Sequence, residues 1–170
     1  MSTSVEARLR DGARVRLRRV GYADAVAQDL VTRVQQEYVH RYGGPDGAVV
    51  VPEEFDPPHG LSLVAEVDGA PAACGAWRSL GDERAEMKRV YVDPAFRRRG
   101  LAQVVVDAVE ADAARAGVRS LVLNTGPEQP EALALYAVLG YTPAPPFGIY
   151  ADEPGAVFLG KDLEERSWAS

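Results

Sequence analysis

The chain has 170 residues, of which 46% are hydrophobic and 26% are charged, and its formal net charge at pH 7 is −6. This composition is typical of a globular protein and excludes a largely disordered chain. The length predicts a single domain over residues 1–170, and the acidic charge excludes a general nucleic-acid-binding protein.

The location of the protein is predicted from three further features. Cys74 is the only cysteine, which excludes an intrachain disulfide and favours a reducing compartment. The first twenty residues are rich in arginine and lack the apolar run of a secretory signal. No apolar run approaches the length of a membrane span. We therefore expect a cytoplasmic protein without membrane association.

The N-terminal half alternates predicted strands and helices. Residues 1–12 are expected to form a flexible arm, and the alternating stretch 13–20 predicts a half-buried strand. Residues 22–42 carry apolar side chains at helical spacing and end at a glycine-rich turn. Residues 48–60 are rich in proline and predict a surface loop. The Asp-Gly pair at 68–69 then predicts a hairpin between two strands.

The C-terminal half predicts a strand at 85–92, a helix at 101–116 capped by Gly117, a strand at 119–125 and a helix at 130–139 that ends at Gly140. A last strand is expected over 156–163. The strand–helix–strand run predicts two parallel strands joined by a right-handed crossover. The fold class is therefore α/β, with a mixed, mostly antiparallel central sheet and helices on both faces.

The stretch RRRGLAQ at 97–103 places three arginines where the helix begins. Cations are unfavourable at a helix N-terminus, because the free N–H groups there already carry partial positive charge. A glycine at this point lets a ligand approach closely, and the N–H groups would bind an anion. A phosphate between the arginines and the helix end would make all of these charges favourable.

The motifs of the common phosphate-binding loops are absent from the sequence. The spacing Arg97-x-x-Gly100-x-Ala102 instead resembles the R/Q-x-x-G-x-G/A signature of the GNAT N-acetyltransferases. Residues 85–110 resemble that family's strand, loop and helix, and residues 121–141 resemble its second motif block. The order of elements over about 13–163 is also compatible with the family.

This resemblance implies the GNAT fold, with a splayed parallel strand pair, and an acetyl-CoA-dependent N-acetyltransferase that acts directly on a primary amine of a small molecule or peptide. Two alternatives stay open at this point. One is a transferase that uses another acyl-CoA, and the other is a non-catalytic acyl-CoA-binding regulatory module. A homodimer is common among relatives.

The resemblance also implies which residues bind the cofactor. The main chain of Val90, Tyr91 and Val92 would pair with the pantetheine arm. The pyrophosphate would lie on the loop formed by Arg97, Arg98, Arg99, Gly100, Leu101, Ala102 and Gln103, with Gly100 the least replaceable. Gln129 stands where relatives often carry a cofactor-binding asparagine, and Asn124 is a second polar candidate at a strand end.

Two residues are candidates for proton transfer. Tyr136 stands where many members carry the tyrosine that protonates the leaving thiolate, whereas the alternative is a core tyrosine. Glu86 is the candidate base, because the attacking amine must be neutral. Its alternative is a solvated carboxylate paired with Lys88 or Arg89. Regular alternation would place Glu86 on the same face as Val90 and Val92, unless a bulge intervenes.

The remaining candidates concern metals, nucleophiles and the acceptor. Cys74 is expected to be a core residue, and the two histidines are too isolated for a metal site. Segments 43–60 and 143–155 are expected to shape the acceptor site. Aromatic residues that could line it are Tyr38, Tyr42, Trp77, Phe147 and Tyr150.

Overall fold

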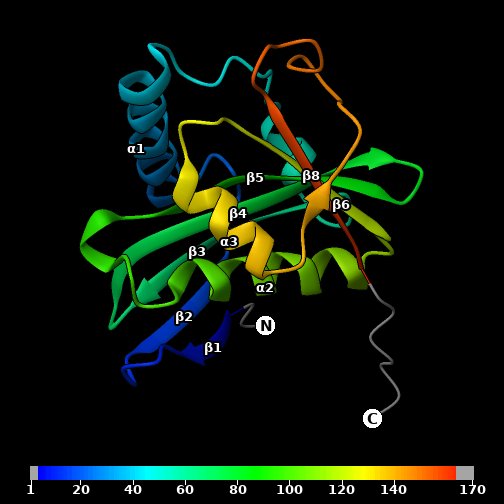
Figure 1. Cartoon of the computed structure of the whole chain (residues 1–170). Coiled ribbons are helices and arrows are strands. Elements are labelled where there is room, and N and C mark those ends of the chain that lie inside the picture. The colour runs from blue at the N-terminus through cyan, green and yellow to red at the C-terminus, as the bar shows by residue number, and fades with distance from the viewer. Residues whose placement is uncertain (1–3, 164–170) are drawn as a thin grey trace.

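The computed structural model describes residues 4–163, which form an eight-stranded sheet with three α-helices (Figure 1). The strands are β1 (Ser4–Arg8), β2 (Arg14–Arg19), β3 (Gly60–Val67), β4 (Ala70–Gly81), β5 (Arg84–Val92), β6 (Ser120–Thr125), β7 (Thr142–Pro143) and β8 (Val157–Asp162). The helices are α1 (Ala25–Tyr42), α2 (Leu101–Arg115) and α3 (Pro130–Val138). Short 3-10 turns cover Pro52–Phe55 and Pro94–Phe96.

The strand order is β1-β2-β3-β4-β5-β6-β8-β7. Every neighbouring pair is antiparallel except β5 and β6, which are parallel and joined by α2. The parallel pairing covers only three residue pairs, from Arg84↔Ser120 to Glu86↔Val122, after which the two strands part. The predicted mixed sheet with a splayed parallel pair is confirmed.

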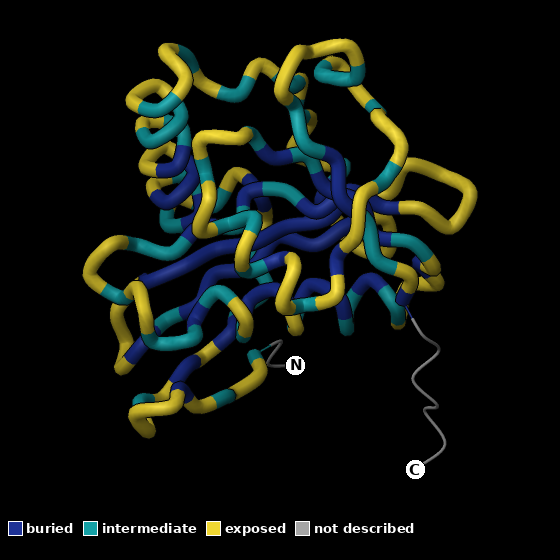
Figure 2. Tube along the Cα trace, viewed as in Figure 1, coloured by how far each residue is buried: buried dark blue, intermediate teal, exposed yellow. Residues whose placement is uncertain are grey.

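Helices cover both faces of the sheet. Leu30 and Val34 of α1 pack with Val64 of β3, whereas Leu63 on the same strand packs in the cluster that contains α2. This division follows from the two-residue period of a strand, which sends successive side chains to opposite faces. The central strands are accordingly buried along most of their length (Figure 2). Tyr136 of α3 belongs to the same cluster as α2.

Local sequence signals explain several element boundaries. The Asp24 carboxylate accepts hydrogen bonds from the N–H groups of Val26 and Ala27, so α1 begins at Ala25 rather than at the predicted residue 22. The β3–β4 hairpin turns at Asp68 and Gly69, both at positive φ, as the Asp-Gly pair predicts. Gly117 also adopts a positive φ, just beyond the end of α2.

The N-terminal segment corrects one prediction. Residues 4–8, expected as part of a flexible arm, form β1 and pair antiparallel with β2. The next residue, Leu9, is 5% exposed and packs in the main core. Val5, Ala7 and Leu9 alternate with polar residues, which is a strand signal that the arginines of this segment obscure.

Candidate functional site

The site is built around the gap between β5 and β6. Glu86 and Val122 form the last residue pair before the strands part. Further along β5, Tyr91 and Val92 pair with β4, and within the described residues Val90, Tyr91 and Val92 have no register partner in β6. Asn124 on β6 also lies beyond the last pair and is half-buried. The unpaired backbone groups along this edge need partners, which a bound ligand could supply.

A bulge in β5 decides which side chains face which side of the gap. The register with β4 shifts between Cys74 and Ala76, and Arg89 adopts a φ of 58°. Val90 and Val92 therefore pack towards α2, whereas Tyr91 packs with Cys74 and α1. Lys88 reaches Asp46, in the segment after α1. The regular alternation that placed Glu86, Val90 and Val92 on one face is therefore wrong.

The loop before α2 presents free backbone N–H groups. Gly100 is the N-cap residue of α2 with a φ of 84°, and no side chain in the described part of the chain caps the helix. Arg98 also adopts a positive φ, of 65°. Leu101 is buried in the core and anchors the helix start, while Ala102 is half-buried and Gln103 is exposed. Uncapped N–H groups of this kind form an anion site.

The three arginines of this loop differ in their partners. Arg97 pairs with Glu37 of α1, donates to the carbonyl oxygen of Val92 at 2.9 Å, and lies over the ring of Tyr91. Arg99 pairs with Asp11 at 2.7 Å. Within residues 4–163, Arg98 has no ion-pair partner.

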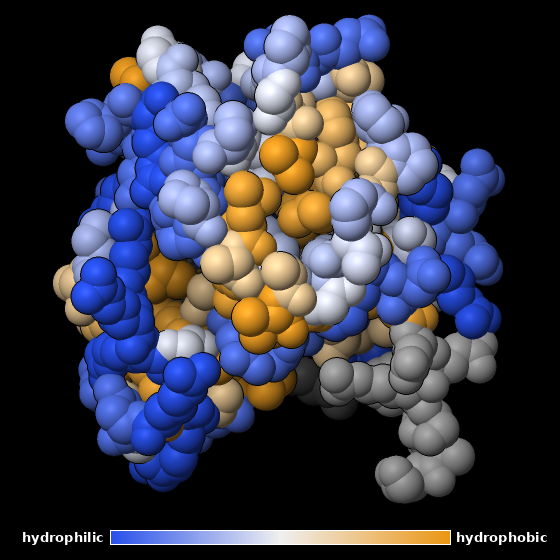
Figure 3. Space-filling model, viewed as in Figure 1, coloured by the Kyte–Doolittle hydropathy of each residue, from blue (hydrophilic) through white to orange (hydrophobic). Residues whose placement is uncertain are grey.

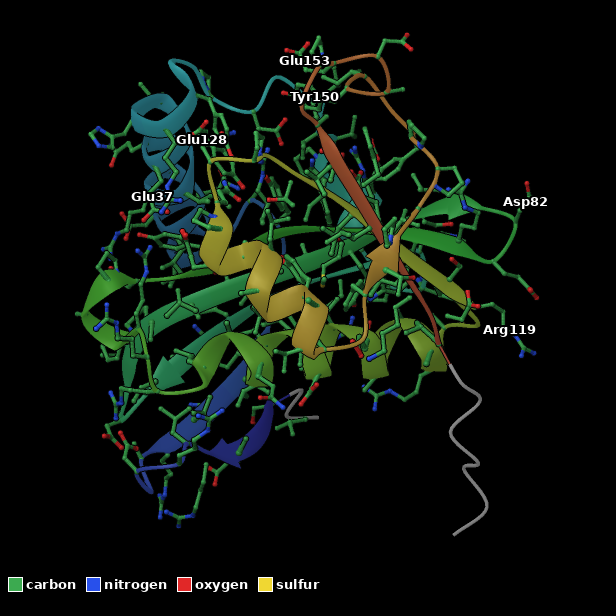
Figure 4. All side chains as sticks on the ribbon, viewed as in Figure 1. Glu37, Asp82, Arg119, Glu128, Tyr150 and Glu153 are labelled. Carbon is green, nitrogen blue, oxygen red and sulfur yellow. The ribbon has the colours of Figure 1, made fainter. Side chains whose placement is uncertain are left out.

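Helix α1 contacts both sides of the gap. Its Glu37 holds Arg97 on the β5 side, and its Arg41 pairs with Glu131 of α3 at 2.6 Å. Arg41 also donates to the carbonyl oxygen of Glu128 at 2.7 Å, and both Glu37 and Glu128 are labelled in Figure 4. Beside the end of β5, a hollow of about 490 Å³ is lined by Arg33, Gln36, Glu37, His40, Arg41, Tyr91, Asp93 and Pro94.

Tyr136 lies on α3 and is buried against Tyr141, with the two ring centroids 5.4 Å apart. Burial, and to a smaller extent Tyr38, raises the pKa of Tyr136 above its ordinary value of 10.0, so the phenol stays protonated at neutral pH. Within residues 4–163 its hydroxyl has no hydrogen-bond partner. The group can therefore donate its proton to a ligand.

Glu86 is 6% exposed, which excludes the solvated carboxylate considered from sequence. Arg78 donates to its Oε1 at 3.0 Å, and Lys88 lies 3.8 Å from its Oε2. Arg89 instead contacts Asp46 at 2.9 Å, so the predicted alternative pair with Arg89 is not formed. Glu86 is a buried, charge-balanced carboxylate at the point where β5 and β6 part.

Asp46 joins the two segments expected to shape the acceptor site. It accepts hydrogen bonds from Lys88 at 3.1 Å, Arg89 at 2.9 Å and the hydroxyl of Tyr150 at 2.9 Å. The Gly47 N–H donates to the same Tyr150 hydroxyl at 2.7 Å. Tyr150 lies near the top of Figure 4, where residues 43–60 and 143–155 meet. No sequence motif marks Asp46.

The remaining residues predicted to bind the cofactor or the acceptor differ in how near they lie to the gap between β5 and β6. Gln129 accepts a hydrogen bond from Thr125 at 2.9 Å and stands directly before α3. Phe147 packs edge-on against Phe158, the register partner of Asn124. Trp77 is directed towards α2, where it donates to Asp112 at 2.8 Å, so it does not line an acceptor site.

Three further observations concern a cysteine nucleophile, a metal site and a membrane-spanning helix. Burial raises the pKa of the Cys74 thiol to about 12, which keeps it protonated and makes it a poor nucleophile. Within the described residues there is no cluster of three metal-ligating side chains, and no helix is long and apolar enough to cross a membrane. Cytoplasmic location and homodimer formation stay predictions.

Comparison with known proteins decides the family. The model of the acetyltransferase (GNAT) family matches residues 17–141. The chain belongs to the GNAT acetyltransferase family. This acetyltransferase is 34% identical over 103 residues to the IAA acetyltransferase of Azospirillum brasilense, a match that covers 59% of the chain and 67% of that protein.

Solved structures show the same GNAT fold. The GNAT domain of S. lividans PAT has a TM-score of 0.73 at 22% identity, with 94% of this acetyltransferase and 97% of that chain covered. A GNAT family acetyltransferase from Elizabethkingia anophelis, solved with acetyl-CoA bound, has a TM-score of 0.64 at 16% identity, with 88% and 98% covered. The protein is therefore an acyltransferase of the GNAT fold.

Proposed function

We propose that this acetyltransferase transfers the acetyl group of acetyl-CoA directly to a primary amine of a small molecule or peptide. The observation that carries the proposal is the gap between β5 and β6, with uncapped N–H groups at the start of α2 on one side and Tyr136 on α3 on the other. This arrangement suits a long ligand with an anionic end and a reactive end.

Acetyl-CoA would bind as a substrate along this gap. The N–H groups of the 98–103 loop would hold its pyrophosphate, and the free edge of Val90–Val92 would pair with its pantetheine amides. The acetyl group would then lie on the side of the gap where β5 and β6 meet, close to Glu86. The amine would enter from the face that carries Asp46 and Tyr150.

The reaction needs two proton transfers. The neutral amine attacks the thioester carbonyl carbon, so a C–N bond forms and the C–S bond breaks. Tyr136 donates a proton to the departing sulfur, and Glu86, directly or through a water, takes the proton that the amine loses. Positioning of the two substrates supplies much of the remaining rate enhancement.

The function is tested by thiol release from acetyl-CoA with a panel of amines that includes amino acids, polyamines, aminoglycosides and peptides. We expect coenzyme A release that depends on one class of amine. Release only with a longer acyl-CoA would favour the alternative acyl donor. Tight binding of acetyl-CoA without release by any amine would overturn the proposal and favour a regulatory acyl-CoA-binding module.

Tyr136→Phe tests the proton donor. We expect kcat to fall about 100-fold while the dissociation constant for acetyl-CoA stays unchanged, because only the proton donor is removed. Tyr141→Phe is the matched control, since Tyr141 packs against Tyr136 but binds Glu110 with its hydroxyl. Unchanged turnover in Tyr136→Phe would exclude this role.

A further inference from the structure

The turn between β1 and β2 lies against the loop at residues 97–103, which we call the cofactor loop because the proposed function places the pyrophosphate of acetyl-CoA there. Leu9 anchors the turn in the core, its N–H donates to the carbonyl oxygen of Ala13 at 3.0 Å, and the Gly12 N–H donates to the carbonyl oxygen of Leu9 at 2.9 Å. Asp11, at the tip, pairs with Arg99 at 2.7 Å. These contacts hold the turn in a defined position beside the start of α2.

The turn places Arg10 directly over Gly100. A Cβ atom on Gly100 would lie 3.6 Å from Nε of Arg10 and 3.9 Å from its Cζ. The guanidinium therefore stands at the N-cap of α2, beside the free N–H groups. Its sequence neighbour Asp11 is engaged by Arg99, and within residues 4–163 Arg10 has no carboxylate partner.

The charges around this point do not balance within the described chain. Four arginines surround the start of α2, of which Arg97 is paired with Glu37 and Arg99 with Asp11. Arg10 and Arg98 add two uncompensated positive charges where the helix dipole is also positive. This arrangement is unfavourable alone but becomes favourable with an anion of about two negative charges, such as a diphosphate.

We propose that Arg10 binds a phosphate of the nucleotide half of coenzyme A, so that the N-terminal hairpin forms part of the cofactor site. This inference rests on the proposed function. Guanidinium groups bind phosphate oxygens through two parallel N–H donors, and the missing side chain at Gly100 leaves room beside Arg10. The β1–β2 hairpin, which carries Arg10, is not part of the R/Q-x-x-G-x-G/A motif by which the loop at residues 97–103 was found.

The test compares Arg10→Gln with the wild type for acetyl-CoA and for acetyl-pantetheine, which lacks the nucleotide half. We expect KM for acetyl-CoA to rise about tenfold, with kcat unchanged and no change in KM for acetyl-pantetheine. Arg10→Lys should recover part of the loss. Arg16→Gln is the matched control, because Arg16 is exposed on the same hairpin in register with Glu6.

A second donor, 3′-dephospho-acetyl-CoA, separates the two kinds of phosphate. If the effect of Arg10→Gln disappears with this donor, Arg10 binds the 3′-phosphate, and if the effect persists, Arg10 binds the pyrophosphate. Equal KM values for acetyl-CoA in the wild type and in Arg10→Gln would overturn the inference. Failure of the proposed function would be recognised separately, because the wild type would then release no coenzyme A with any amine. Calorimetric dissociation constants for acetyl-CoA would still compare Arg10→Gln with the wild type in that case.

Discussion

At the scale of single residues, Asp46 is the point where two loops meet the buried Arg89 and the half-buried Lys88. Burial alone would raise the pKa of Asp46, but Lys88, the N–H of Ala48 and Arg89 lower it from 3.8 to about 2. Because the pKa is lower in the folded state, the carboxylate stabilises the fold above about pH 4. That contribution, about 2 kcal/mol, is lost as pH falls towards 2.

We therefore expect the difference in unfolding free energy between the wild type and Asp46→Asn to shrink between pH 4 and pH 2. Urea unfolding at a series of pH values measures this difference. Asp82→Asn, at the exposed turn between β4 and β5, is the control (Figure 4). A difference that stays constant across this range would show that the Asp46 contacts do not depend on its charge.

The backbone conformation of a residue was predictable where a local motif determines it, whereas side-chain contacts between residues distant in sequence were not predictable. Gly100, with its positive φ at the start of α2, follows from a six-residue pattern. Asp46 and Arg89 are 43 residues apart, and no pattern in either segment points to the other. The sequence did not decide whether β5 contains a bulge, because alternation of apolar and polar residues does not locate an extra residue such as the one at Arg89.

At the scale of elements, α2 lies so close to β4 that only glycine fits at one position. A Cβ atom at Gly75 would lie 2.6 Å from Cγ1 of Val105 and 3.3 Å from Cγ2 of Val109. Both valines are fully buried and cannot move aside without disturbing the core. The approach of α2 in turn fixes where the loop at residues 97–103 lies, because that loop leads directly into the helix.

We expect Gly75→Ala to lower the free energy of unfolding by about 1–3 kcal/mol, because it overpacks this contact. Gly44→Ala is the matched control, since a Cβ atom there would have no neighbour within 4 Å. Thermal unfolding of both variants measures the effect. Equal melting temperatures for the two variants would show that α2 and β4 accommodate the added methyl group at Gly75 without loss of stability.

Elements with strong local signals were predictable, whereas β1 and the two-residue strand β7 were not predicted. The Asp-Gly signal predicted the hairpin of β3 and β4, and capping and helical-spacing signals predicted α1 and α2 to within a few residues. The alternation in β1 is only five residues long and carries two charged side chains. Its strand state depends on pairing with β2, a contact that a local pattern does not contain.

At the scale of the whole molecule, the fold class was predictable because one crossover rule limits the topology. The strand, helix and strand over 85–125 predicted the parallel pair of β5 and β6, and the hairpin signal predicted antiparallel neighbours. The same succession at β2, α1 and β3 gives an antiparallel pair, so the succession alone does not decide the direction of pairing. The full strand order was not predictable, since β8 inserts between β6 and β7. Segment 143–155, which lies between β7 and β8, contacts Asp46 through the hydroxyl of Tyr150.

The short pairing of β5 with β6 divides the sheet into two sections. One section runs from β1 to β5 and the other contains β6, β8 and β7, so each comes from one continuous stretch of chain. Between the sections only three strand residue pairs are formed. A ligand bonded to both sides of this seam would connect the two sections, and folding stability would then rise with its concentration, by about 2.7 kcal/mol at one hundred times the dissociation constant.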